Sequence, residues 1–316
     1  MLGRGGLVEP LYDASADGFL RALFAAYYHL AKMPTYGREC TMDLAPRDDR
    51  ATLFFDVDGT IIHHPADADT GETVANAVPT PAVVSAFHRL RDEGHHTFIC
   101  TGRPLCLVSQ ALKDLRPTGL VTSAGACLVI DGKVASEEVI PEDVLVETIE
   151  RIVDAGAQVL LEGTEGCVAL VPSGEKYHGI PGVATARDLD GVRRVSNMRF
   201  CKFSYEDDQL DRVCELGGFL DRYFVRYDLG LGCGEACLIG LDKATGVRRA
   251  LEYLGIGFHN TYAFGDSEND LPMLRAVETP VAMGNALQSV KDAAVYVTRA
   301  VEEDGVPAAL EHFGLL

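Results

Sequence analysis

Two aspartates stand two residues apart in the segment of the chain best suited to chemistry. Asp56 and Asp58 belong to residues 56–60 (Asp-Val-Asp-Gly-Thr), which follow the apolar run 51–55. At the extended end of a strand, residues two apart point the same way, so these carboxylates repel each other and need a cation beside them. Oxygen ligands suit a hard cation, and Mg²⁺ is the usual choice beside phosphate. A plain turn with hydrogen-bonding aspartates explains the same letters, so this segment alone does not decide.

A second polar segment also follows an apolar run. Residues 101–104 (Thr-Gly-Arg-Pro) come directly after the run that ends at Cys100. In one interpretation Thr101 only caps a helix that holds Pro104 in its first turn. In the other, the Thr101 hydroxyl and nearby backbone N–H groups hold a phosphate at a helix N-terminus.

Lys243 and residues 265–270 complete the set. Lys243 is expected in the first turn of a helix, where the dipole disfavours a cation. It is therefore either a solvated side chain or a residue that binds an anion. Residues 265–270 (Gly-Asp-Ser-Glu-Asn-Asp) place three acids after another apolar run. Asp266 could be only an N-cap, but exposed caps rarely need so many acids. Together, the four segments favour one shared site over four coincidences.

The elements that must position these residues alternate between short apolar runs and helical patterns. Strands are predicted at 51–55, 95–100, 119–122, 261–264 and 277–282, with helices at 81–93, 243–254 and from 268. This alternation is typical of an α/β fold with a doubly wound parallel sheet. Ligand sites in such sheets lie outside the carboxyl ends of the strands, where the three segments that follow strands would meet.

The alternation is interrupted in the middle of the chain. A hairpin with an Asp-Gly turn is predicted at 126–139, and mixed helices and strands follow to about residue 239. We therefore expect a core formed by residues 48–125 plus 240–316, with an inserted α+β domain at 126–239. Residues 1–47 form an N-terminal extension with one predicted helix. The sequence leaves open whether that helix packs on the protein or binds a partner, and whether the chain genuinely starts at Met42.

Composition limits the partners. The 28 Lys and Arg against 47 Asp and Glu give a net charge of −19, which repels nucleic acid and anionic membranes. It also repels phosphate, so a phosphate enzyme of this charge needs a metal or well-placed basic side chains. The nine cysteines have no CxxC spacing, which favours free thiols in a reducing cytoplasm. We expect no signal peptide, and no apolar run reaches the ~20 residues needed to cross a bilayer.

With these four segments in this order, the sequence resembles the haloacid dehalogenase-like (HAD) hydrolase superfamily. It is most similar to the Cof-type phosphatase branch, in which a type-IIB cap is inserted between the second and third motifs. Residues 281–286 and 303–306 also match that branch. The resemblance covers residues 51–285 and the C-terminal match, but not the extension. It implies a Rossmann-like core with an α+β cap that determines substrate specificity.

The resemblance also implies roles for individual residues. Asp56 is expected to be the nucleophile and Asp58 the general acid/base. Mg²⁺ is expected on Asp56, the backbone carbonyl of Asp58 and Asp266, with Asp270 supporting the metal shell. The residues expected to bind phosphate are Thr101, Gly102, Lys243 and Asn269. One position departs from the branch, because Ala124 stands where an Asn-Gly-Ala sequence usually begins.

The expected activity is hydrolysis of small phosphorylated metabolites, such as sugar phosphates, through an aspartyl-phosphate. A phosphomutase or phosphotransferase would use the same nucleophile, and a non-catalytic protein that binds phosphate esters is a third possibility. The insert is expected to be a lid, and its candidate substrate contacts are Lys176, Tyr177, His178, Arg193, Arg194, Arg199 and Lys202. His63 and His64 are expected to be solvated.

Overall fold

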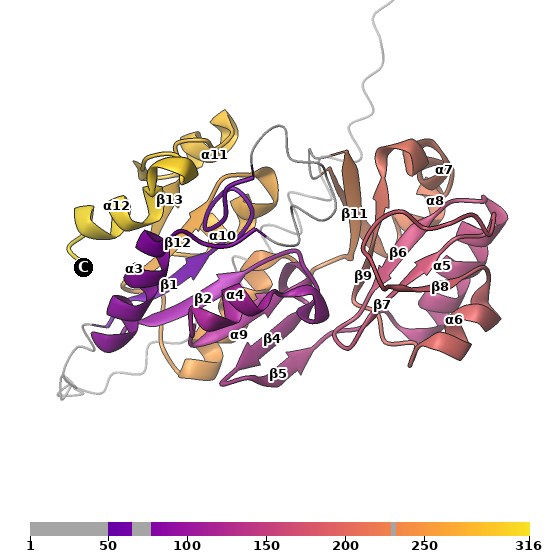
Figure 1. Ribbon diagram of the computed structural model, residues 1–316, viewed down its shortest axis with the longest axis horizontal. Helices are drawn as coiled ribbons and strands as arrows, with labels where there is room; N and C mark the ends of the chain where they lie inside the picture. Colours follow the sequence, from indigo (N-terminus) through magenta and orange to yellow (C-terminus); the bar gives the residue numbers. More distant parts are fainter. Residues whose placement is uncertain (1–49, 65–76, 229–231) are drawn as a thin grey trace, which may run out of the picture. The chain divides into compact units, whose positions relative to one another are not determined.

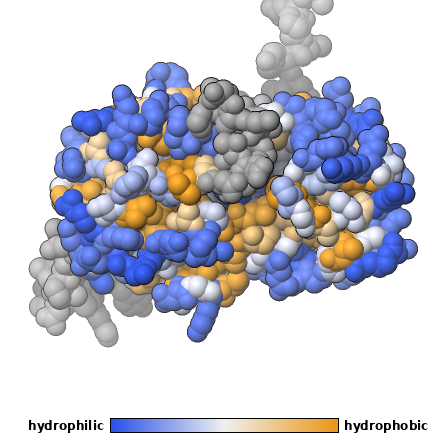
Figure 2. Space-filling view, viewed as in Figure 1, coloured by the Kyte–Doolittle hydropathy of each residue, from blue (hydrophilic) through white to orange (hydrophobic). Residues whose placement is uncertain are grey.

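The computed structural model describes residues 50–64, 77–228 and 232–316 (Figure 1). Within them the strands form two separate sheets, of eight and six strands. The helix predicted in the N-terminal extension lies outside the described residues. Figure 2 shows hydrophilic residues over both ends of the drawn face and hydrophobic residues gathered across its middle.

The first sheet has the order β14-β13-β12-β1-β2-β3-β4-β5. Its strands are β1 (Thr52–Phe55), β2 (His96–Cys100), β3 (Gly119–Thr122), β4 (Cys127–Ile130), β5 (Lys133–Glu137), β12 (Thr261–Gly265), β13 (Thr279–Ala282) and β14 (Tyr296–Val297). All neighbours from β14 to β3 are parallel, whereas β4 and β5 add as antiparallel strands. The predicted α/β class with a doubly wound parallel sheet is confirmed.

The central strand β1 is buried along its whole length. A strand covered on both faces needs apolar residues in succession, which explains the unbroken run there. Phe54 stacks on Phe98 of β2 with ring centroids 5.1 Å apart, and Phe55 stacks on Phe264 of β12 at 4.7 Å. These stacked pairs align β2, β1 and β12, so the residues that follow the three strands emerge at one edge of the sheet.

Helices cover this sheet. They are α3 (Pro81–Asp92), α4 (Gln110–Asp114), α9 (Lys243–Leu254), α10 (Leu271–Leu274), α11 (Gln288–Ala293) and α12 (Gly305–His312), with 3-10 turns η1 (Leu105–Leu107), η2 (Ser123–Gly125), η4 (Glu268–Asp270) and η5 (Val301–Glu303). Helix α9 begins because the Asp242 side chain accepts a hydrogen bond from the Thr245 N–H, and it ends at Gly255, which has left-handed backbone angles. This N-cap fixes Lys243 in the first turn.

The second sheet has the order β10-β11-β9-β6-β7-β8. Its strands are β6 (Val159–Glu162), β7 (Cys167–Leu170), β8 (Ala184–Ala186), β9 (Lys202–Glu206), β10 (Phe224–Asp228) and β11 (Cys233–Leu238). It is mainly antiparallel. The accompanying helices are α5 (Glu142–Asp154), α6 (Leu189–Val195), α7 (Leu210–Glu215) and α8 (Gly217–Leu220), with the 3-10 turn η3 (Asp207–Gln209). One face of the sheet shares a single hydrophobic core with residues of these helices.

The predicted hairpin belongs to a different sheet from the one expected. We assigned residues 126–139 to the insert, but β4 pairs with β3 and extends the first sheet. The physical reason is the tight turn η2, where Ala124 and Gly125 both have positive φ and reverse the chain at once. The predicted Asp-Gly turn is present, since Asp131 and Gly132 have φ of 49° and 72°.

Candidate active site

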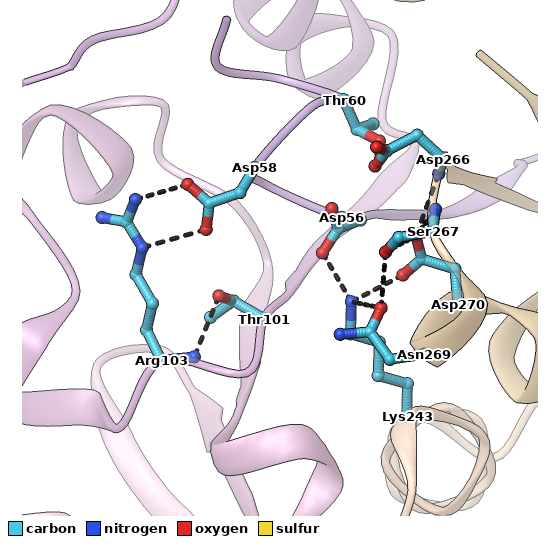
Figure 3. Close-up of polar contacts among 10 residues, drawn as sticks. All are labelled: Asp56, Asp58, Thr60, Thr101, Arg103, Lys243, Asp266, Ser267, Asn269 and Asp270. Atoms are coloured by element: carbon cyan, nitrogen blue, oxygen red, sulfur yellow. Dashed lines mark hydrogen bonds and ion pairs between the residues drawn. The ribbon is translucent and has the colours of Figure 1, made fainter. Parts of the chain in front are cut away.

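The polar segments meet at the carboxyl ends of three neighbouring strands (Figure 3). Asp56 follows β1, Thr101 follows β2, and Asp266 follows β12. Asp56 and Thr101 are buried, whereas Asp266 is half-buried. Lys243 reaches the same place from the start of α9.

Lys243 is buried between two carboxylates. Its Nζ lies 2.5 Å from Asp56 Oδ1, 2.5 Å from Asp270 Oδ1 and 3.5 Å from Asn269 Oδ1. Burial by itself would lower the pKa of Lys243, but Asp270 and Asp56 more than offset this and raise it. The two ion pairs also offset the unfavourable position in the first helical turn. Lys243 is therefore not a solvated side chain, and it holds one oxygen of Asp56 in place.

Asp270 anchors the loop that carries Asp266. Its Oδ2 accepts hydrogen bonds from the backbone N–H groups of Asp266 (2.9 Å) and Ser267 (3.1 Å), and its Oδ1 accepts from Lys243. Gly265 has to be small, because a Cβ there would lie 2.6 Å from Asp270 Cβ. Asp270 is thus fully buried and bound by protein donors on both oxygens.

Three of these acids form a cluster that fits a divalent cation. Asp56, Asp266 and Asp270 each offer an oxygen within 4.8 Å of the others. Burial, and next the charge of Asp270, raise the pKa of Asp56 well above its usual range and that of Asp266 to about 7. A divalent cation would favour the ionised forms, and an all-oxygen donor set is what Mg²⁺ prefers. Gly59 lets the first motif approach, since a Cβ there would collide with the Asp266 carboxylate.

The Asp58 side chain points away from this cluster towards basic groups (Figure 3). Arg103 donates from Nε to Oδ2 (3.1 Å) and from Nη2 to Oδ1 (2.5 Å), and His64 Nε2 lies 2.7 Å from Oδ1. Burial by itself would raise the pKa of Asp58, but the His64 hydrogen bond and the Arg103 charge lower it to about 2. Asp58 is thus held as a carboxylate on the side of the site opposite Lys243.

Sequence reasoning missed two of these basic residues. His64 was expected to be solvated, which is wrong, because its side chain is only 14% exposed and bonds Asp58. Arg103 belongs to the segment 101–104, but no role was predicted for it. A histidine six residues after Asp58 carries no distinctive signal, whereas an arginine directly after the Thr101-Gly102 pair, which was predicted to bind phosphate, is a signal that sequence analysis could use. His63, by contrast, is 41% exposed and lies 3.8 Å from Glu302.

The Thr101 segment lacks the helix start that both interpretations of it included. No helix begins at residue 101 or 102; η1 begins at Leu105, and the side-chain cap of α4 is Ser109. Thr101 Oγ1 instead accepts a hydrogen bond from the Arg103 N–H at 3.1 Å, which closes a tight loop. The expected N-terminal helix dipole is therefore missing here, because Pro104 is extended and delays the helix. Backbone N–H groups of the loop are what a phosphate could use.

The family model of haloacid dehalogenase-like hydrolases matches residues 53–310. The chain belongs to this family. The resemblance found in the sequence is therefore confirmed, and the match runs through both sheets and all four motif segments.

Relatives cover most of this HAD hydrolase. The putative phosphatase YkrA of Bacillus subtilis is 29% identical over 278 residues, which are 85% of this chain and 99% of YkrA. Among solved structures, the HAD subclass IIB sugar phosphatase BT4131 matches with a TM-score of 0.68 at 23% identity, over 84% of this chain and 100% of that one. BT1666 from Bacteroides thetaiotaomicron, an HAD phosphatase, matches with the same TM-score and identity over 87% and 100%.

These comparisons identify the chain as a phosphatase of the HAD family. The two solved structures support its fold rather than its substrate, given their low identity. Within the described part of the chain, no helix is both long and apolar enough to span a membrane.

Proposed function

We propose that this phosphatase hydrolyses small phosphorylated metabolites with Mg²⁺, through a phosphoryl group carried on Asp56. The observation that carries the proposal is the setting of Asp56. Its buried carboxylate has one oxygen fixed by Lys243 at 2.5 Å, and two further acids lie within 4.8 Å. A fixed carboxylate beside cationic groups suits attack on phosphorus, because phosphoryl transfer depends mainly on positioning and on neutralising charge.

In the first step, an Asp56 oxygen attacks phosphorus. The new bond joins that oxygen to phosphorus, and the bond from phosphorus to the ester oxygen breaks. Asp58 donates a proton to the departing alkoxide, so the alcohol leaves neutral. In the second step, Asp58 takes a proton from water, which attacks the same phosphorus and releases inorganic phosphate and free Asp56.

Asp58 suits the second step as it stands, because Arg103 and His64 keep it ionised. The first step requires a protonated Asp58, so the contact with Arg103 must loosen when the ester binds. An incoming phosphate is a strong competitor for a guanidinium. We therefore propose that Arg103 pairs with Asp58 when no substrate is bound and with the phosphate ester when substrate is bound.

The Asp56 and Asp266 side chains and the Asp58 backbone carbonyl would hold Mg²⁺, while Asp270 keeps the loop and Lys243 in place. When bound, the ion neutralises the acids and the phosphoryl oxygens. The phosphoryl oxygens are assigned to four groups: the Thr101 hydroxyl, the Gly102 backbone N–H, the Lys243 ammonium and the Asn269 amide. This division of roles explains why a chain of net charge −19 can hold an anion.

We also propose that the second sheet with its helices, residues 138–239, is a lid domain that closes over the alcohol part of the substrate. We start this domain at residue 138 rather than at residue 126, because β4 and β5 belong to the first sheet. A lid of this kind excludes water while the ester is bound, and it restricts the substrate to small molecules.

The decisive experiment replaces Asp56 by Asn and assays p-nitrophenyl phosphate with Mg²⁺. Release of phosphate should fall by at least ~10³-fold, and mass spectrometry should find no phosphorylated protein after rapid acid quenching. EDTA should silence the wild-type enzyme, and added Mg²⁺ should restore it. Full activity of Asp56→Asn would contradict the assignment of Asp56 as the nucleophile. Transfer to an added sugar in preference to water would instead favour a phosphotransferase.

A further inference from the structure

A second buried lysine lies on the sheet of the proposed lid. Lys202 Nζ in β9 is 2.5 Å from Glu235 Oε2 in β11 and 3.2 Å from Glu162 Oε2 in β6. All three side chains are at least nine-tenths buried. The strands are neighbours, with β9 between β6 and β11, so the triad crosses the middle of the sheet. The proposed chemistry uses none of these residues.

The triad faces away from the hydrophobic core of this sheet. Successive residues of a strand point to opposite faces. Phe203 and Ala236, which follow Lys202 and Glu235, lie in the core that includes the helices. The charged residues therefore occupy the other face, which no helix of this core covers. Burying three ionisable groups there is costly, and a simple structural purpose would be served as well by apolar residues.

This other face meets the phosphate-binding loop of the active site. A Cβ placed on Gly102 would lie 3.4 Å from Glu235 Oε2 and 3.9 Å from Glu235 Oε1. The carboxylate is thus packed against the loop that carries Thr101 and Arg103. These distances are ordinary van der Waals contacts, so the carboxylate and the loop touch without crowding. A group from the second sheet consequently stands within reach of whatever is attached to a phosphate held by this loop.

One oxygen of this carboxylate lacks a proper donor. Glu235 Oε2 accepts from Lys202, but Oε1 is buried and forms no hydrogen bond of normal geometry with the described residues. The Cys237 thiol, two residues along β11, is the other group beside it, and thiols are weak donors. Buried carboxylate oxygens are nearly always satisfied, so Oε1 calls for an O–H or N–H donor from outside the protein.

The charge of the triad limits which chemical groups can donate a hydrogen bond to Glu235 Oε1. Two carboxylates and one lysine sum to −1, beside an acidic catalytic cluster. A second anionic group on the substrate would be repelled, whereas a neutral hydroxyl can donate to Oε1.

We propose that Glu235 is a specificity-determining residue, whose Oε1 accepts a hydrogen bond from a hydroxyl of the alcohol part of the phosphate ester. This rests on the proposed function. The preferred substrates are then phosphate esters of neutral polyols or sugars, and phosphorylated carboxylic acids are rejected. Lys202 and Glu162 are positioning residues that fix the Glu235 carboxylate.

The test compares three esters with the full chain and Mg²⁺: sorbitol 6-phosphate, phosphoglycolate and p-nitrophenyl phosphate. The wild type should prefer the sorbitol ester to phosphoglycolate. In Glu235→Gln, the amide oxygen should face Lys202, and the amide NH₂ then takes the place of Oε1. That position can no longer accept a hydrogen bond from the substrate hydroxyl. The ratio of kcat/KM for the sorbitol ester to that for p-nitrophenyl phosphate should then fall at least ~10-fold, and the rate with phosphoglycolate should rise. Glu150→Gln removes an exposed carboxylate from α5 on the opposite side of this sheet and should leave both ratios unchanged.

Each outcome decides between the two proposals. If the wild type hydrolyses none of the three esters, the proposed function itself fails. If it hydrolyses p-nitrophenyl phosphate but prefers phosphoglycolate, only the Glu235 assignment fails. The assignment also fails if Glu235→Gln slows all three esters equally, because that is the mark of a structural role. Lys202→Arg, which keeps a cation between the carboxylates, should preserve the wild-type order of the esters.

Discussion

Two buried lysines in this phosphatase each pair with two carboxylates, but they lie at different places relative to the sheets. Lys243, in the first turn of α9, lies 2.5 Å from both Asp56 and Asp270 at the edge of the first sheet. Lys202 lies 2.5 Å from Glu235 and 3.2 Å from Glu162, in the second. Each ammonium is buried, and for each the nearby carboxylates raise the pKa despite a burial that by itself would lower it. Pairing chemistry alone therefore does not distinguish them.

Their places in the sheets differ. Lys243 meets acids at the carboxyl ends of parallel strands, where a third acid, Asp266, adds surplus negative charge. Lys202 lies on the face of antiparallel strands whose backbone groups are used in the ladder. Among the described residues, a metal-compatible acid cluster occurs only beside Lys243. Under the two proposals made above, the same kind of ion triad serves chemistry at a strand end and recognition on a sheet face.

The largest expected effect is the loss of catalysis in Lys243→Met. Without the ammonium, Asp56 loses the partner that fixes it, and the phosphoryl oxygens lose a cation. The kcat for p-nitrophenyl phosphate should fall by ~10³-fold or more. Mg²⁺ should partly restore the melting temperature of this variant, since the ion can neutralise the same acids. Turnover within 10-fold of wild type would mean that Lys243 is not needed for catalysis.

Lys202→Met should chiefly affect stability. It leaves Glu162 and Glu235 buried without a cation, and the free energy of unfolding in urea should fall by about 3 kcal/mol. Mg²⁺ should not restore it. In the matched triple variant, Lys202→Met with Glu162→Leu and Glu235→Leu, no buried charge remains and most of the loss should be recovered. A loss below about 1 kcal/mol in the single variant would mean that the triad is more solvated than its burial implies.

Metal binding should stabilise the first sheet through Asp266. At Mg²⁺ concentrations near 100 times Kd, the protein should gain about 2.7 kcal/mol, a rise in melting temperature of roughly 5 °C. Asp266→Asn should abolish the rise. Because the pKa of Asp266 is raised to about 7, the neutral amide should be tolerated in the metal-free protein. An equal rise in wild type and variant would place the ion elsewhere.

Arg103→Gln should produce a smaller loss that depends on pH. The pKa of Asp58 is lowered to about 2, so its contribution to stability is full above the unfolded value near 3.8 and is lost as pH falls through about 2. Removing Arg103 should cost about 1–2 kcal/mol at pH 7, since Asp58 is partly exposed and His64 remains. The difference between wild type and variant in urea unfolding should shrink by pH 3. A difference that grows on acidification would contradict the assignment.

The smallest effect is expected at the turn that supports Lys243. Ala124 has φ 53° and ψ 37°, a left-handed conformation, and η2 packs against the start of α9. Ala124→Gly should stabilise the protein by about 0.5–1 kcal/mol, because glycine adopts these angles without strain. The control Ala86→Gly, inside helix α3, should destabilise it. Destabilisation by both variants would mean that the turn is not strained.

The acidic motifs and their strands were predictable because the signals are local. A short apolar run that ends in Asp-x-Asp-Gly, or in Thr-Gly, predicts a buried strand and its polar end from a few residues. Asp56, Thr101 and Asp266 were therefore assigned to one sheet edge, where the structure places them. Their chemical roles remain predictions. The 126–139 hairpin shows the limit of this reasoning, since its strands and turn were predicted but not the sheet that it joins.

The α/β class, the family and the acids at the strand ends could be predicted from the sequence, because each depends on residue types within one short segment. The contacts of Arg103 and His64 with Asp58, the hold of Asp270 on its loop and the pairing of Lys202 with Glu162 and Glu235 became visible only in the folded chain. These contacts depend on side-chain direction and on pairing between distant strands. Many lysines and glutamates of an acidic chain could form such pairs, and only the register of β6, β9 and β11 selects these three.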